Sequence, residues 1–114
     1  MDERVAAVVR VVAAGFEPGV GREVERLIRS GGAEAGERSF DPGLAVAIAA
    51  LMVNVIGTLF TVVQTIIQAG GQPAAAVVER RVLVEVVPPP GVSEETLTRI
   101  VRLAVAEALR APPG

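Results

Sequence analysis

The sequence predicts a single α+β domain, spanning residues 1–114, that is mostly helical. Two patterns indicate this fold class. A long run without charged residues has the length and the sorting of polar side chains expected of a central helix, and one valine-rich stretch alternates like a strand. Of the 114 residues 51% are hydrophobic and 3% are aromatic, so the chain is too apolar to be disordered and too short for two substantial domains.

Residues 1–32 predict two short helices. Residues 5–16 carry apolar side chains at helical spacing, although their valines leave a strand open as an alternative. Residues 17–21 contain a proline and two glycines and predict a turn, which is followed by a helix over residues 22–30. We expect the glycine pair that follows to end this helix, because glycine adopts the left-handed cap conformation without strain.

A long apolar helix is expected over residues 41–69. Asp41 suits the N-cap because its carboxylate accepts amide hydrogen bonds, and Pro42 suits the first helical position because no N–H is needed there. Residues 43–70 contain no charged side chain, and this length is sufficient to cross a bilayer. At about 100° per residue, the small and polar residues of the run fall on one side of the helix. They are Asn54, Gly57, Thr58, Thr61, Gln64, Thr65 and Gln68.

This sorting leaves two interpretations open. The favoured one is a core helix of a soluble, cytoplasmic domain, and the alternative is a membrane span that packs its small, polar face on another helix. Because solvent-facing helices usually carry charges, we expect this uncharged face to be covered by protein, whether the second helix, the C-terminal helix or another subunit. Asn54 in particular is expected to set the register between packed helices. The candidate interaction residues are Asn54, Thr58, Thr61, Thr65 and Gln68.

A strand is predicted over residues 77–87. Val82, Val84 and Val86 alternate with other side chains, which is typical of a strand with one more deeply buried face. A lone strand cannot satisfy its own backbone groups, so it needs a partner. The candidates for that partner are residues 5–12, residues 33–40 and the same strand of a second copy.

A final amphipathic helix is predicted after the strand. Ser93 is expected to cap it, and Glu94 and Glu95 lie in its first turn, where carboxylates stabilise the helix dipole. Apolar side chains then recur at helical spacing, so we expect one face to be packed and the other to be solvated. The strand and this helix make up residues 77–110 of the domain.

The residue types that are missing exclude most catalytic chemistry. The chain contains no Cys, His, Lys, Trp or Tyr. Without His and Cys there is no ordinary zinc, haem or iron–sulfur site and no thiol nucleophile, and without Lys there is no Schiff base. We therefore expect no enzymatic activity, no cofactor and no metal. Eleven basic residues against thirteen acidic ones give a net charge of −2, which argues against a nucleic-acid binder.

Two short motifs have a functional and a structural interpretation. Gly19 and Gly21 precede a helix and could hold a phosphate, but the third glycine of such loops is absent and a plain turn is favoured. Arg80 and Arg81 could recognise an anionic partner or flank a membrane span, and a solvated strand end is favoured.

The order of elements over residues 41–110 resembles the small effector-associated adaptor domains of bacterial conflict systems. The resemblance is carried by the Asp41-Pro42 helix start, the long uncharged helix, the valine-rich strand that ends at Val87 and the helix with an acidic first turn. It implies a non-catalytic module, of a kind common in actinobacteria, that tethers effectors and sensors through like-with-like contacts. It transfers no functional residues.

The functional expectation is a non-enzymatic protein–protein interaction or oligomerisation module. We expect a homo-oligomer that covers the polar face of the long helix, in which a two-fold axis could pair the strand at residues 77–87 with the same strand of a second copy. The alternative from another class is a small single-span membrane protein that associates through the small, polar face of residues 43–69.

Overall fold

The computed structural model describes residues 2–30 and 43–110, and all the regular structure in these two ranges is α-helical. The helices in chain order are α1 (Glu3–Ala13), α2 (Pro18–Arg29), α3 (Gly43–Gln68), α4 (Ala75–Glu85) and α5 (Glu94–Arg110). The predicted long apolar helix is confirmed, as is the helical character of the domain. The α+β class is wrong, because no strand or sheet is present in these ranges.

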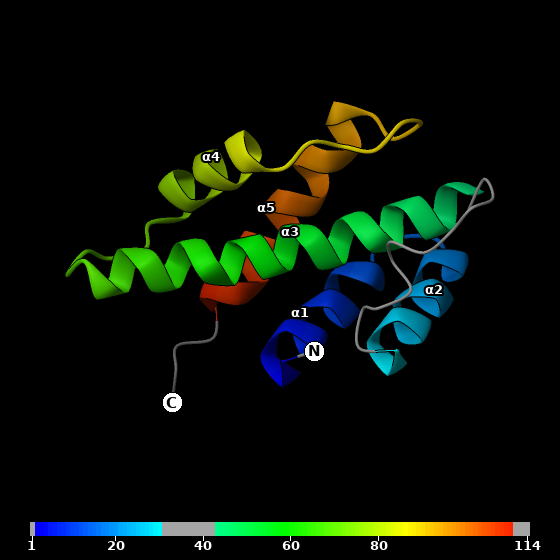
Figure 1. Cartoon of the computed structure of the whole chain (residues 1–114), viewed down its shortest axis with the longest axis horizontal. Helices are drawn as coiled ribbons and strands as arrows, with labels where there is room; N and C mark the ends of the chain where they lie inside the picture. Colours follow the sequence, from blue (N-terminus) through cyan, green and yellow to red (C-terminus); the bar gives the residue numbers. More distant parts are fainter. Residues whose placement is uncertain (1, 31–42, 111–114) are drawn as a thin grey trace.

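The 26-residue helix α3 is the axis around which the other helices are arranged (Figure 1). The first two helices, α1 and α2, contact each other and lie on one side of α3. From the end of α3 the chain turns back, so that α4 lies along another side, and α5 then crosses α3 and contacts α1 and α4. Each of the four shorter helices therefore buries its apolar stripe against the same central helix.

Side-chain caps fix the start of α1 and of α5. The carboxylate of Asp2 accepts a hydrogen bond from the amide of Arg4, with 2.7 Å between Oδ1 and N. The hydroxyl of Ser93 accepts one from the amide of Thr96 at 3.1 Å, so Ser93 is confirmed as the cap of the last helix. Each cap satisfies an amide that has no partner inside the helix.

Glycine ends α3. Gly70 has a φ of 85°, a left-handed conformation that side-chain-bearing residues avoid. This turn lets the amide of Gly71 donate to the carbonyl of Ile66 and the amide of Gly70 donate to that of Ile67, both at 3.0 Å. The two bonds satisfy the carbonyls of the last helical turn and reverse the chain towards α4.

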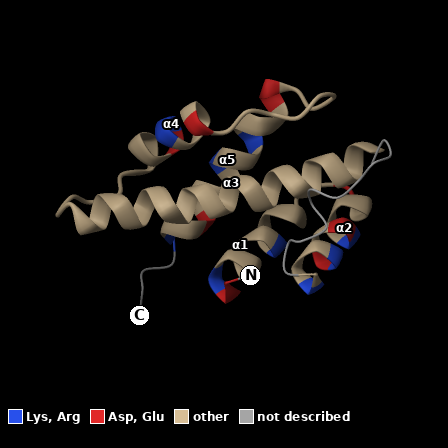
Figure 2. Cartoon of the chain, viewed as in Figure 1, with Lys and Arg blue, Asp and Glu red and all other residues tan. Residues whose placement is uncertain are grey.

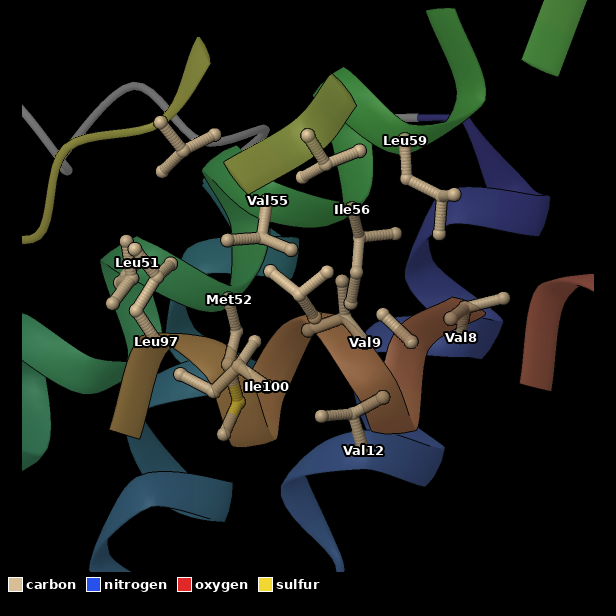
Figure 3. Close-up of a cluster of buried hydrophobic side chains, with 14 of the residues drawn as sticks. Val8, Val9, Val12, Leu51, Met52, Val55, Ile56, Leu59, Leu97 and Ile100 are labelled. Carbon is tan, nitrogen blue, oxygen red and sulfur yellow. The ribbon is translucent and has the colours of Figure 1, made fainter. Parts of the chain in front are cut away.

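The core is apolar, and among the described residues no polar or charged residue is buried. In Figure 3, Met52 and Ile56 of α3 point towards Ile100 of α5 and Val9 of α1. All four of these side chains are fully buried. The buried residues of α3 are Ala49, Leu51, Met52, Val55, Ile56, Leu59 and Val62.

Arg99 on α5 joins the last helix to the turn between α1 and α2. Its guanidinium carbon lies 4.4 Å from the centre of the Phe16 ring, the distance of a cation–π contact. One of its nitrogens donates to the carbonyl of Gly15 at 3.0 Å, across a sequence separation of 84 residues. This side chain therefore stabilises a contact between the first and last parts of the described fold.

The strand predicted over residues 77–87 is wrong, because α4 occupies most of this segment. Val82 and Val86 are buried, but Val84 between them is 79% exposed, so the three valines do not share one face. Val78 and Val82 face the core instead, at the four-residue spacing of a helix. A helix satisfies its backbone groups internally, whereas a strand here would have no neighbouring strand in the described chain. Packing on α3 and α5 outweighs the strand preference of valine.

The two predicted N-terminal helices are present, but the turn between them is shorter than expected. The second helix begins at Pro18, because proline at the first helical position needs no N–H. Gly19 and Gly21 therefore lie in the first turn of α2 and not in a loop. The strand alternative for residues 5–12 is excluded, because this segment is part of α1.

Several predictions concern residues 31–42, which lie outside the described residues. They are the glycine pair that ends the second helix, the strand partner at residues 33–40, and the Asp41-Pro42 helix start.

Candidate interaction surface

One side of α3 is not covered by the other described helices. We call this side the open face of α3. It is opposite the buried residues of the helix, and most of its side chains are exposed, with Gly57 and Thr58 half-buried. The open face comprises Asn54, Gly57, Thr58, Thr61, Gln64, Thr65 and Gln68.

The structure brings three of the five candidate interaction residues together. Asn54, Thr58 and Thr61 line one shallow groove, and the residues that complete its lining are Val53, Gly57 and Glu85. Thr65 and Gln68 lie further along the open face, outside this groove, and both are exposed. Neither α2 nor α5 covers the exposed side chains of this face, so the expected protein cover would have to come from another subunit.

The two exposed threonines of α3 satisfy their own donors. The hydroxyl of Thr61 donates to the carbonyl of Gly57 at 3.2 Å, and the hydroxyl of Thr65 donates to that of Thr61 at 2.9 Å. Such bonds to the preceding turn are common for threonine in helices. They leave the threonine oxygens free to accept a hydrogen bond from outside the helix.

Asn54 has no hydrogen-bond partner within residues 2–30 and 43–110, and its side chain is exposed. An asparagine side chain offers two N–H donors and a carbonyl acceptor. Asn54 therefore brings three unused hydrogen-bonding sites to the middle of the open face.

Gly57 has no side chain, so another molecule can approach the backbone of α3 closely at this position. A methyl group placed at Gly57 would meet no atom of the described residues within 4 Å, apart from the adjoining backbone of α3. Glycine in the middle of a helix is destabilising relative to alanine, and the packing of the described residues gives no reason for it here. Its position on the open face, beside Asn54 and Thr61, allows close packing of a second helix.

The charged side chains of the described residues lie outside α3, most of them on the other helices (Figure 2). Arg10 of α1 and Glu25 of α2 form an ion pair, with 2.9 Å between Nε and Oε2, and the hydrogen bond from Arg10 holds the pKa of Glu25 below its ordinary value. Arg102 of α5 pairs with Glu79 of α4 at 3.2 Å. In contrast, α3 carries no charge along its length, so its open face loses little ionic solvation when it is covered.

The groove contains no pair of ionisable groups, since Glu85 is the one such side chain in its lining. A second hollow on α5 is lined by Glu94, Glu95, Thr98, Arg99, Arg102 and Leu103. Over the described ranges, no three acidic side chains come close enough to hold a metal ion. The surface chemistry of the open face is that of uncharged hydrogen bonding and close packing.

Glu85 and Val53 are groove residues that the sequence pattern does not indicate. A strand at residues 77–87 would give no reason to put Glu85 beside α3. The four-residue spacing of Val78 and Val82 is the signal that indicates a helix packed on α3 and thereby brings Glu85 to the groove.

By length and composition, α3 is a helix that could cross a membrane. In the structure 39% of its most apolar 18-residue window is buried inside the protein, and four helices pack against it. The core helix of a water-soluble domain can have the same length and composition, so these two properties alone favour neither location.

The resemblance to effector-associated adaptor domains stays an expectation, and its strand element is helical in the structure. No protein-family model matches the chain, and neither a curated protein nor a solved structure matches it.

Proposed function

We propose that the chain is a non-enzymatic, cytoplasmic self-association module in which the open face of α3 packs on the same face of a second copy. The observation that carries this proposal is an exposed, uncharged face on a helix that packs against the four other described helices. Helix faces exposed to solvent usually carry charged residues, and this one has none over 26 residues.

A two-fold arrangement fits the chemistry of this face. If two α3 helices pack antiparallel with the axis beside Gly57, Asn54 of each copy lies opposite Thr61 of the other. The hydrogen of the Thr61 hydroxyl is already directed to Gly57, so its oxygen accepts from the Asn54 amide. Each such bond contributes on the order of 1 kcal/mol, and the absence of a side chain at Gly57 allows the helices to approach closely.

Self-association of this kind is also what the resemblance to adaptor domains implies. An adaptor that tethers effectors to sensors by like-with-like contacts needs a surface that recognises its own copy. We therefore extend the proposal to a role as an adaptor in a bacterial defence or signalling system, with the open face of α3 as the contact.

Light scattering over a concentration series tests the proposal. The wild-type chain is expected to form dimers or a larger closed assembly as its concentration rises. The double variant Asn54→Glu, Thr61→Glu places two carboxylates on exposed positions of the open face, where pairing would bury them. This variant should remain monomeric with an unchanged helical circular dichroism spectrum.

The matched control carries the same two charges elsewhere. Ala7 on α1 and Ala106 on α5 are exposed helix positions outside the open face, so Ala7→Glu with Ala106→Glu should associate like the wild type. A wild-type chain that stays monomeric at the highest concentration would contradict the proposal. So would an assembly that the Asn54→Glu, Thr61→Glu variant leaves intact.

The second candidate function is a membrane protein that uses α3 as its span. This candidate is favoured by the length and composition of α3. It requires the four helices that pack on α3 to move away from it, so that the apolar faces of α3 contact lipid. Membrane fractionation separates the two functions. A chain recovered with membranes, and released by detergent but not by salt, would support the span and contradict the cytoplasmic module.

A further inference from the structure

The outer face of α4 carries exposed valines between two arginines. Val77 and Val84, seven residues apart, lie on the side of α4 away from the core and are 49% and 79% exposed. Arg80 and Arg81 are also exposed, and at helical spacing they fall on either side of the line joining these valines. We call these four residues the outer face of α4.

The two arginines have no anionic partner in the described part of the chain. Other arginines do, since Arg102 pairs with Glu79 and Arg10 pairs with Glu25. The outer face of α4 therefore combines apolar side chains with two positive charges that the chain itself does not neutralise, although the protein is net acidic.

The turn between α3 and α4 extends this surface without charges. Residues 43–78 contain no charged side chain, and Figure 2 shows that the end of the molecule formed by this turn carries none. At this end Ile67, in the last turn of α3, is 56% exposed. An apolar end with arginines one helical turn away has the composition of a surface that contacts the boundary between lipid headgroups and acyl chains.

A second copy is a poor occupant of this face. A symmetric antiparallel pair of α4 helices would bring Val77 opposite Val84, but it would also bring Arg80 of one copy beside Arg81 of the other. Two positive charges at the centre of an interface repel each other and lose solvation. The partner must instead supply many negative charges around an apolar region.

We propose that the outer face of α4 docks on an anionic lipid bilayer. The valines enter the headgroup boundary, and the arginine side chains extend to the lipid phosphates with their charged ends in the polar layer. Because Arg80 and Arg81 lie beside the exposed Val77 and Val84, the protein binds with α4 against the membrane. This surface is separate from the open face of α3, so each proposal can fail without the other.

Vesicle flotation tests the docking. Vesicles of phosphatidylcholine alone are compared with vesicles in which half of the lipid is phosphatidylserine, at low and high salt. The wild-type chain should float with the anionic vesicles and stay at the bottom of the gradient when only neutral vesicles are present. It should be released from the anionic vesicles as the salt concentration rises. The Arg80→Gln, Arg81→Gln variant should bind the anionic vesicles at least roughly tenfold more weakly than the wild type.

Two further variants distinguish this face from general electrostatics. Val77→Ser with Val84→Ser should also weaken vesicle binding, because it removes the apolar contact and leaves the charge unchanged. Arg22→Gln with Arg29→Gln removes two exposed arginines of α2 and should leave binding as in the wild type.

Three outcomes would overturn the proposal. They are no flotation of the wild type with anionic vesicles, equal flotation with neutral ones, and equal losses for the α2 and α4 arginine variants. An acidic protein is the other class of partner for such a face. Retention on immobilised polyglutamate through Arg80 and Arg81, without vesicle binding, would assign the face to that class and refute lipid docking.

Discussion

A methyl group added at Gly57 distinguishes the stability of one chain from the strength of its pairing. The new methyl group of Gly57→Ala meets no described atom within 4 Å beyond the adjoining backbone of α3, so it should stabilise α3 by about 0.5–1 kcal/mol through helix propensity. If the open faces pair closely at this residue, the same methyl group should weaken association. Urea unfolding at low concentration measures the first effect, and light scattering at high concentration measures the second.

The control for this prediction is Gly21→Ala. Gly21 also lies in a helix with free space around it, but it is on α2, away from the open face. It should leave association unchanged. Stabilisation at Gly57 together with undiminished association would show that the close contact is elsewhere.

The ion pair between Arg10 and Glu25 predicts a small pH dependence of stability. The hydrogen bond from Arg10 lowers the pKa of Glu25 below its ordinary value of 4.5 in the folded chain. A lowered folded-state pKa stabilises the fold above the ordinary pKa, and this stabilisation is lost as the pH falls through the lowered one. Wild type should therefore melt slightly higher than Glu25→Gln at neutral pH, and the difference should vanish in acid.

Thermal unfolding followed by circular dichroism at a series of pH values measures this difference. Both side chains are about half exposed, so added salt should reduce the neutral-pH difference as well. A difference that persists in acid would mean that the glutamine substitution acts through packing and not through charge.

At the scale of the element, α4 shows why spacing alone misassigned one segment. Val82, Val84 and Val86 alternate as strand residues do, but Val78 and Val82 also have helical spacing, and valine is common in both kinds of core. What decides between them is the presence of α3 and α5, against which a helix can bury one stripe. Such long-range contacts are not visible in a window of eleven residues.

Substitutions at Val82 and Val84 test the helical register. In a strand the two side chains share a face, whereas in α4 Val82 is fully buried and Val84 is 79% exposed. Val82→Ala should therefore cost about 2 kcal/mol of unfolding free energy, and Val84→Ala should change it by less than about 0.5 kcal/mol. Urea unfolding followed by circular dichroism measures both, and equal losses would favour the strand.

At the scale of the molecule, the core depends on α3. Met52 is fully buried and lies beside Ile100 of α5 in Figure 3. Met52→Ala should lower the unfolding free energy by roughly 2–5 kcal/mol, a large part of the total for a domain of this size. Leu44→Ala, at a position that is 58% exposed, should have little effect in the same urea titration.

The sequence predicts which residues share the open face of α3, but it does not predict which molecule covers that face. Spacing along one helix is enough to put Asn54, Thr58 and Thr61 on the side away from the apolar residues, and the structure keeps them together at one groove. The groove's other wall, Glu85, depends on how α4 folds back, which is a property of the tertiary structure. Whether a second copy covers this face depends on how the surfaces of two molecules fit together. A local sequence pattern does not predict such a fit.

The contact between α1 and α5 has a consequence for how the protein is made. Among the described helices α1 leaves the ribosome first and α5 last, and Arg99 reaches back across 84 residues to Gly15. Part of the packing of α1 is thus incomplete until translation has passed α5. Throughout that interval the side of α1 that packs on α5 is accessible to chaperones and to neighbouring nascent chains.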